Sequence, residues 1–337
     1  MLRTGAPEGR KIKARTRLRL SAAMLVVLAT LMGVGVGPSL AEDTLSGAFR
    51  QRIAATGKRG FLYLVTSANA DVENAASTRL YLYGTVHVGK PSLFPLNDEV
   101  AKCLDGSTRL ALEADPGKES SIARLVQQLA IYPENDSLSN HIPADLLARL
   151  PEVGDRLHIP MARMLRMRAW MLSQSLDMLE LAREGLSGGE GVDVLLAQYA
   201  TQRNIPIVEI EGFERQLQLL SGEPDPVQID ELRDSIDEIQ DGQAAHDAQT
   251  LLDGWANADV DAVESNLAEL RERDSAFSRY LLDEILNARN RTMADRAEQF
   301  LAEGGTTFFA VGSLHLFSEQ GLVSELKRRG YRVQNLQ

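Results

Sequence analysis

The sequence predicts an α/β protein with a mixed sheet, built from two related strand-helix-strand halves and a large helical insertion. Short runs of β-type residues lie near both ends of the chain, at about 60–115 and 304–337. Between them, about 118–303 carries apolar residues at every third or fourth position, which is typical of helices. A hydrophobic content of 44% in 337 residues is typical of a globular protein and excludes fibrous or disordered classes.

The first 41 residues have the layout of a secretory signal peptide. Seven basic residues precede the apolar run AAMLVVLATLMGVGV, and the small residues Ser39 and Ala41 follow it. We predict cleavage after Ala41, which leaves 42–337 as one domain in the periplasm or outside the cell, with no membrane attachment. An uncleaved anchor is the alternative, because the apolar run with its flanks approaches the ~20 residues that span a bilayer.

Three runs rich in Leu, Val and Tyr predict the first half of the sheet: FLYLVTS (61–67), RLYLYGTV (79–86) and TRLALEA (108–114). The polar stretch between the first two predicts a hairpin. The segment PSLFPLNDEVAKCLDG, before the third run, has the apolar spacing of a helix and stops at Gly106. A strand-helix-strand unit predicts that its two strands are parallel.

The same patterns predict the elements of the insertion and of the second half. NIPIVEI (204–210) predicts one strand among the helices, and the methionines between 161 and 178 are predicted to fill the core. The acid-rich segment 225–258 predicts the solvated face of a helix. TTFFAVG (306–312), a helix and YRVQNL (331–336) then repeat the strand-helix-strand order of the first half, which predicts an internal duplication.

One strand of each half ends in Gly-x-x-His. Gly84 and His87 stand in YLYGTVHVGK, and Gly312 and His315 stand in FFAVGSLHLF. We expect both histidines at the carboxyl edge of parallel strands, where open α/β sheets form their binding crevice. A histidine on a loop after a strand is suited to bind metal, and each glycine lets the backbone approach a ligand closely. The other histidines, at 141, 158 and 246, are predicted to be surface or capping residues.

Glu113, in LALEAD, is the acidic residue expected to join the two histidines. A catalytic metal site has about three protein ligands and an open position for water. Two roles remain open for Glu113, metal ligand or general base, and a helix cap or salt bridge is its structural alternative. The three side chains predict a site for a divalent ion, Mn²⁺, Co²⁺ or Zn²⁺, that supports hydrolysis.

Charge and cysteine content limit the partners and the covalent structure. Removal of 1–41 takes away seven basic residues and one acid, which changes the net charge from −11 to −17. Nucleic acid, a polyanion, is therefore an unfavourable partner. The single cysteine, Cys103, cannot form an intramolecular disulfide and is predicted to be a small buried hydrophobic residue.

The ordered set of motifs resembles the TraB/GumN family, which is related to the Tiki metalloproteases and more distantly to the ChaN and erythromycin-esterase group. Besides the two Gly-x-x-His segments, the matching pieces are LALEADP, GVDVLLAQYA with IPIVEIEGFERQL, and ARNRTMADRAEQFL. The resemblance implies that His87, His315 and Glu113 lie in a metal site.

The resemblance also implies roles for four further residues. Arg289 and Asn290 match the family's Arg-Asn pair and are expected to orient the substrate, with the arginine stabilising an oxyanion or holding a carboxylate. Asp193 and Glu211 match further family positions, where tying helices to the sheet is their simplest role. The second motif departs from the family through Ser313, Leu314 and Phe317; we expect Leu314 and Phe317 to narrow the entrance and change the substrate.

The sequence therefore predicts an exported metal-dependent hydrolase, a peptidase that acts on a peptide or small polymer through a metal-activated water. The alternative is an envelope protein that binds a peptide or glycan without cutting it. A third possibility is a scaffold whose site is degenerate.

Overall fold

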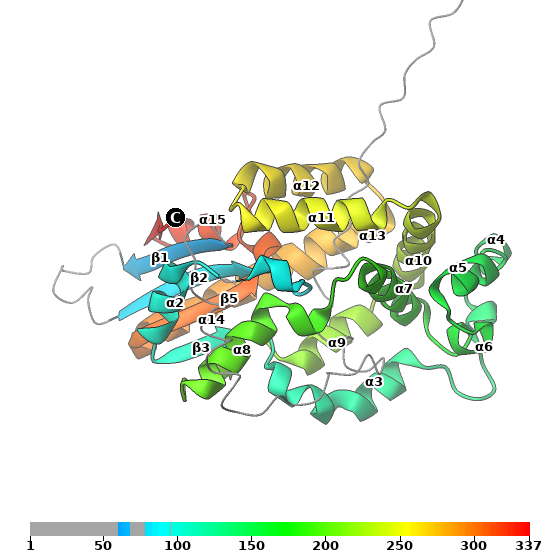
Figure 1. Ribbon diagram of the computed structural model, residues 1–337, viewed down its shortest axis with the longest axis horizontal. Helices are drawn as coiled ribbons and strands as arrows, with labels where there is room; N and C mark the ends of the chain where they lie inside the picture. The colour runs from blue at the N-terminus through cyan, green and yellow to red at the C-terminus, as the bar shows by residue number, and fades with distance from the viewer. Residues whose placement is uncertain (1–59, 68–77, 95) are drawn as a thin grey trace, which may run out of the picture.

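The computed structural model describes residues 60–67, 78–94 and 96–337. A mixed sheet lies at one end and the helices α4, α5 and α6 lie at the opposite end (Figure 1). The predicted α/β class with a large helical insertion is confirmed. The predicted signal peptide, 1–41, is outside the described residues. Within these ranges, no helix has both the length and the apolar character needed to cross a bilayer.

Six strands of the described residues form the sheet, in the order β4-β3-β5-β2-β1-β6. Their bounds are β1 Phe61–Ser67, β2 Thr78–Thr85, β3 Arg109–Leu112, β4 Ile207–Glu209, β5 Gly305–Gly312 and β6 Tyr331–Asn335. β1 pairs antiparallel with both β2 and β6, which confirms the antiparallel pairing predicted for the first two runs. The pairs β2–β5, β5–β3 and β3–β4 are parallel.

The two predicted strand-helix-strand units cross the sheet in opposite directions. From β2 the chain passes through α2 (Asp98–Asp105) to β3, beyond β5. From β5 it passes through α15 (Leu322–Arg328) to β6, beyond β2 and β1. The adjacent strands β2 and β5 therefore form a topological switch point, and a crevice is expected at their carboxyl ends.

Helices cover both faces of the sheet (Figure 1). Phe309 of β5 contacts Phe300 of α14 (Arg289–Glu303), with ring centroids 6.2 Å apart. The next residue toward the amino end, Phe308, points to the opposite face and contacts Tyr83 of β2. On that face, α8 (Val192–Gln202) packs against β3 and β4. Burial on both faces explains the continuous apolar run in β5.

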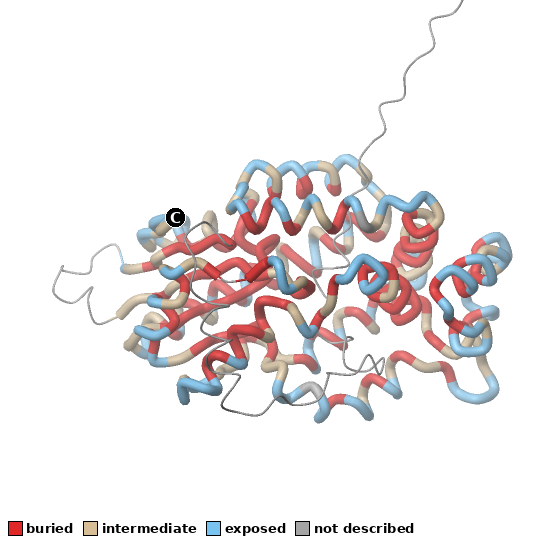
Figure 2. Tube along the Cα trace, viewed as in Figure 1, coloured by how far each residue is buried: buried red, intermediate tan, exposed pale blue. Residues whose placement is uncertain are grey.

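The insertion forms the rest of the molecule. Its remaining α-helices are α3 (Ala123–Ala130), α4 (Ala144–Leu147), α5 (Leu150–Leu157), α6 (Met161–Met164), α7 (Ala169–Arg183), α9 (Phe213–Ser221), α10 (Asp225–Asp241), α11 (Ala244–Ala256), α12 (Val260–Arg273) and α13 (Ala276–Tyr280). Short 3₁₀ turns lie at Pro91–Leu93, Pro116–Ile122, Leu138–Asn140, Gly188–Glu190 and Ser313–His315. Figure 2 shows that α7 is buried along most of its length, which makes it the central helix of this part.

The insertion confirms one prediction about its core and corrects another. Met164, Met167, Met171 and Met178 are buried, as predicted for core-filling methionines. The acid-rich segment was predicted to be a solvated face, but Glu231, Glu238 and Asp247 in it are buried. The reason is tertiary packing: α10 lies against α7 and α13, and Gln174 of α7 donates a hydrogen bond to Glu231 (2.6 Å).

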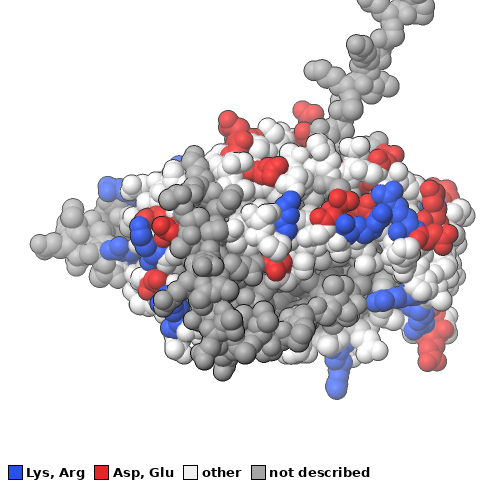
Figure 3. Space-filling view, viewed as in Figure 1, with Lys and Arg blue, Asp and Glu red and all other residues white. Residues whose placement is uncertain are grey.

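The surface of the described residues carries both positively and negatively charged side chains. On the face shown in Figure 3, Lys and Arg side chains lie among Asp and Glu side chains. The other histidines behave as predicted, since His141 and His246 are exposed and exposed His158 ends α5 in a left-handed conformation. Cys103 is buried, also as predicted.

Candidate functional site

The two histidines lie at the switch point, each held through Nδ1. His87 follows β2, and its Nδ1 lies 2.7 Å from the Asp193 Oδ2 atom of α8. His315 ends the turn after β5, and its Nδ1 lies 2.7 Å from Asn290 Oδ1. Because Asn290 Nδ2 donates to the Gln320 carbonyl, its Oδ1 is the acceptor for the ring. Both Nδ1 atoms therefore carry the proton, which leaves each Nε2 as a potential metal donor.

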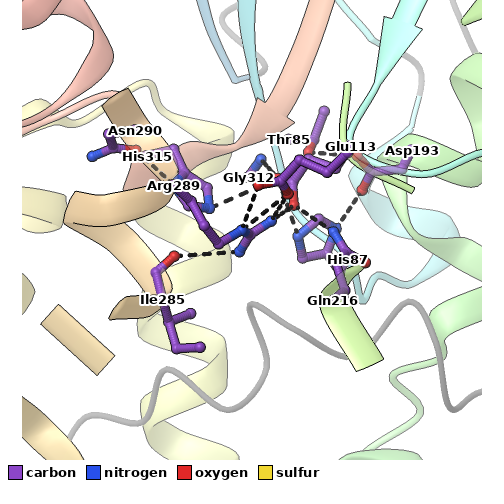
Figure 4. Close-up of polar contacts among 11 residues, drawn as sticks. Thr85, His87, Glu113, Asp193, Gln216, Ile285, Arg289, Asn290, Gly312 and His315 are labelled. Atoms are coloured by element: carbon purple, nitrogen blue, oxygen red, sulfur yellow. Dashed lines mark hydrogen bonds and ion pairs between the residues drawn. The ribbon is translucent and has the colours of Figure 1, made fainter. Parts of the chain in front are cut away.

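Glu113 lies between the two rings, immediately beyond the end of β3 (Figure 4). Its Oε1 is 3.9 Å from His87 Nε2 and 4.0 Å from His315 Nε2. The backbone N–H of Gly312 donates to the same Oε1 at 2.7 Å. Side chains from three separate strand ends thus meet around one carboxylate. The predicted strand 108–114 stops earlier, at Leu112, so Asp115 leaves the sheet and caps the turn that follows.

Arg289 holds the far side of this carboxylate. Its Nη2 donates to Glu113 Oε2 at 2.5 Å and to Glu211 Oε2 at 2.6 Å, and its Nε also contacts Glu211. The Gln216 amide donates to Glu113 Oε2 at 3.0 Å. The Arg289 side chain is only 5% exposed. Its hydrogen bonds therefore go to protein carboxylates, although the sequence predicts contact with substrate.

An irregular helix precedes Arg289 and Asn290, the first two residues of α14. The segment Leu281–Ala288, just before α14, is a π-helix, and the Ile285 carbonyl accepts a hydrogen bond from Arg289 Nη1. Neighbouring residues on a regular α-helix point about 100° apart. Here Arg289 reaches the carboxylates and Asn290 reaches His315. Insertions of this kind are frequent at functional sites, but the apolar spacing of the segment does not reveal one.

Two close approaches explain the glycines of the motifs. A Cβ on Gly84 would lie 2.4 Å from a methyl carbon of Leu316 and 3.2 Å from the Ser313 Cα, so Gly84 lets the two motif segments pack together. A Cβ on Gly312 would lie 3.1 Å from His87 Nε2 and 3.5 Å from Glu113 Oε1. It would enter the space next to the donor atoms.

The environment sets different protonation states for the three central groups. Burial would raise the pKa of Glu113, but Arg289, the two histidines and the Gly312 N–H lower it to about 2. Burial, together with the positive charge of Arg289, lowers the pKa of His315 to about 3. Burial would also lower the pKa of His87, but the hydrogen bond and charge of Asp193 raise it. Glu113 is therefore anionic and His315 neutral at pH 7.

The donor set fits a divalent cation, although its atoms are spread too widely to hold one as they stand. Two carboxylates, Glu113 and Glu211, pair with the Arg289 guanidinium, and a third, Asp193, pairs with His87, so with neutral imidazoles the cluster has an excess of two negative charges. Two ligands of a tetrahedral zinc ion are about 3.4 Å apart. The observed separations are 3.9 and 4.0 Å. Within the described ranges, no group of three His, Cys, Asp or Glu side chains already has metal-binding geometry.

Sequence reasoning missed three members of the site. The Thr85 hydroxyl donates to Asp193 Oδ1 at 2.8 Å, and Gln216 binds Glu113. Gly191 faces the His87 carbonyl, where a Cβ would lie at 2.4 Å. Thr85 lies within the first motif itself, and alternation along β2 could have identified it. Nothing local points to Gln216, because its role depends on how α9 packs beside β3.

Comparison with known proteins identifies the family of the chain. The sequence model described as the TraB/PrgY/gumN family matches residues 70–335. The uncharacterized protein YbaP of Escherichia coli (strain K12) is 25% identical over 257 residues, which cover 76% of this chain and 91% of YbaP. A protein named metalloprotease TIKI homolog, from Amphimedon queenslandica, is 24% identical over 310 residues, which cover 77% of this chain and 60% of that protein. No solved structure shows significant similarity.

The matched region contains every side chain of the buried cluster, from Thr85 to His315. It also covers about four fifths of the sequence and includes every strand of the sheet except β1. The chain therefore belongs to the TraB/PrgY/gumN family.

Proposed function

We propose that this protein is an exported metal-dependent hydrolase that cleaves peptide bonds. The observation that carries the proposal is the convergence of two Nε2 atoms on one carboxylate oxygen, within 4.0 Å, in a buried cluster. The similarity to a protein named a metalloprotease adds support, and the basic and apolar pattern of 1–41 supports export to the periplasm or beyond.

His87, His315 and Glu113 would hold the ion. Two imidazoles and a carboxylate suit Zn²⁺, Co²⁺ or Mn²⁺. When bound, such an ion lowers the pKa of water toward 7 and polarises a carbonyl, which is the chemistry that hydrolysis needs. The two Nε2–Oε1 separations would have to shorten by about 0.5–0.6 Å to reach the ligand spacing of a tetrahedral site. The space that Gly312 leaves beside the donors allows this shortening.

Glu113 is better suited to be a ligand than a general base. A pKa of about 2 means that the carboxylate stays anionic but accepts a proton weakly near neutral pH. Its Oε2 is already occupied by Arg289 and Gln216, so Oε1 is the atom that faces the two rings. We therefore assign Glu113 to ion binding.

The remaining polar residues are positioning residues. Asp193 and Asn290 fix the two rings with Nε2 directed inward, and Arg289 fixes Glu113 while compensating its charge and that of Glu211. Such outer partners orient ligands and increase their basicity. They make a rigid cluster before any substrate arrives.

Incubation with a random peptide library tests the proposal. The protein without residues 1–41, supplied with Zn²⁺, Co²⁺ or Mn²⁺, should generate new peptide termini that mass spectrometry detects. A chelator, or the variant Glu113→Gln, should reduce them at least 100-fold. Retention of peptides with no new termini under any of the three ions would refute the hydrolase and favour the binding protein.

Asp193→Asn should weaken Zn²⁺ binding by about 10–100-fold without unfolding the protein. The carboxylate holds both Thr85 and His87, and the amide removes its negative charge while keeping its shape. Competition with a chelating dye measures the affinity. Asp155→Asn, on the exposed side of α5, is the matched control and should bind like the wild type. Equal affinities of both variants would exclude a role for Asp193 in ion binding.

A further inference from the structure

A cavity of about 50 Å³ adjoins the candidate site. It lies between the two motif segments on one side and α11 and α12 on the other. The residues His87 and Gly312 belong both to its wall and to the buried cluster. A group that enters this cavity therefore lies next to two residues of the candidate site.

The lining of the cavity is largely aliphatic. It includes Val86 and Val88 of the first motif, Leu314 of the second, and Ala248, Leu252 and Val263 of the two helices. Among the described residues that line it, none except His87 is ionisable. A charged side chain would lose its hydration here without gaining a partner, so the cavity favours an apolar group.

The volume limits the size of that group. One water needs about 10–15 Å³ by this measure, and a cavity of about 150 Å³ accommodates benzene. A cavity of about 50 Å³ therefore has room for an aliphatic side chain such as that of valine or leucine. By the same comparison, a phenyl ring needs about three times this volume.

The walls are fastened to one another. Trp255 of α11 donates its indole N–H to the Gly84 carbonyl at 2.8 Å, which ties α11 to the end of β2. One turn and a half earlier, the Gln249 side chain accepts a hydrogen bond from Lys90 at 2.5 Å. Two links hold α11 against the first motif, so the cavity is formed before a ligand binds.

We infer that this cavity is a specificity subsite that accepts one small aliphatic side chain of the peptide, next to the bond that is cut. The inference rests on the proposed function. Leu314, a departure from the family pattern, narrows the cavity from the side of the second motif. Phe317, the other departure, packs against Phe61 with ring centroids 4.7 Å apart and lies elsewhere.

Peptides that differ at one position test the subsite. The series Ac-Gly-Gly-Xaa-Gly-Gly-amide, with Gly, Ala, Val, Leu, Phe or Asp at Xaa, is assayed for cleavage with Zn²⁺ and, by calorimetry, for binding to the metal-free protein. The Val and Leu peptides should be cleaved at least 10-fold faster, and bound at least 10-fold more tightly, than the Gly, Phe and Asp peptides.

Two variants change the volume of the cavity in opposite directions. Ala248→Leu should remove the preference for the Val and Leu peptides. Val263→Ala should raise the cleavage rate and the affinity of the Phe peptide about 10-fold. Ala268→Leu, the same substitution on the exposed face of α12, is the control and should match the wild type. Stoichiometric Zn²⁺ uptake by each variant checks that the cluster has formed.

The outcomes separate the subsite from the hydrolase. Cleavage of all six peptides at equal rates would overturn the subsite and leave the hydrolase standing. Selective binding of the Val and Leu peptides that Ala248→Leu abolishes, without cleavage, would support the subsite and refute the hydrolase. Equal binding of all six peptides, or of none, together with no cleavage would overturn the subsite as well.

Discussion

The double variant His87→Ala/His315→Ala should lose stoichiometric binding of Zn²⁺, Co²⁺ and Mn²⁺. The two rings supply both nitrogen donors of the proposed site, and one carboxylate oxygen cannot retain a transition-metal ion against water. Isothermal calorimetry on the protein without 1–41 should give about one ion per chain for the wild type and an affinity at least 1,000-fold lower for the variant, a loss of more than about 4 kcal/mol of binding free energy.

Two further histidines provide the control for this experiment. His141 and His246 are exposed and lie outside the cluster, so His141→Ala/His246→Ala removes the same number of imidazoles from the chain. This variant should bind each ion like the wild type. Equal uptake by the wild type and by the variant that lacks His87 and His315 would remove the basis of the metal site.

Arg289→Met should lower the free energy of unfolding by about 3–5 kcal/mol, because it leaves two carboxylates buried without their cation. The side chains of Glu113 and Glu211 are 6% and 4% exposed, so water cannot replace the guanidinium. Methionine keeps much of the length of arginine and limits the packing change. Urea unfolding followed by circular dichroism, with a chelator present throughout, measures the difference.

An exposed arginine gives the comparison. Arg279 pairs with Asp274 at 2.6 Å, but its side chain is 57% exposed. Arg279→Met should therefore change the free energy of unfolding by less than about 1 kcal/mol. If Arg289→Met also changed the free energy of unfolding by less than about 1 kcal/mol, the buried carboxylates would not need their cation, and the proposed rigid cluster would lose its support.

Local patterns predict the strands of the sheet well. β1, β5 and β6 lie within one residue of the predicted runs, because their Val, Tyr, Phe and Leu residues and flanking glycines are strong signals even over five to eight residues. β4 is shorter than predicted, since only Ile207–Glu209 pairs with β3. An apolar run shows strand propensity, but the partner strand decides where pairing ends.

The neighbours of the site residues are harder to predict. The motifs point to His87, His315 and Glu113. The structure places the Nε2 atoms of both histidines within 4.0 Å of Glu113 Oε1. The motifs do not show that Arg289 donates its hydrogen bonds to Glu113 and Glu211, because its contact with Glu113 joins residues 176 positions apart in the chain. The burial of Glu231 depends in the same way on α7.

The place of β5 between β2 and β3 has a consequence for biosynthesis. β2 and β3 each pair with β5, which is made almost two hundred residues after β3. During translation, neither strand has this partner until 305–312 has left the ribosome. Contacts this distant in sequence form slowly, so we expect the nascent chain to remain open for a long time. A chain in that state would suit the proposed export, and the proposed ion site would then be assembled only after transport.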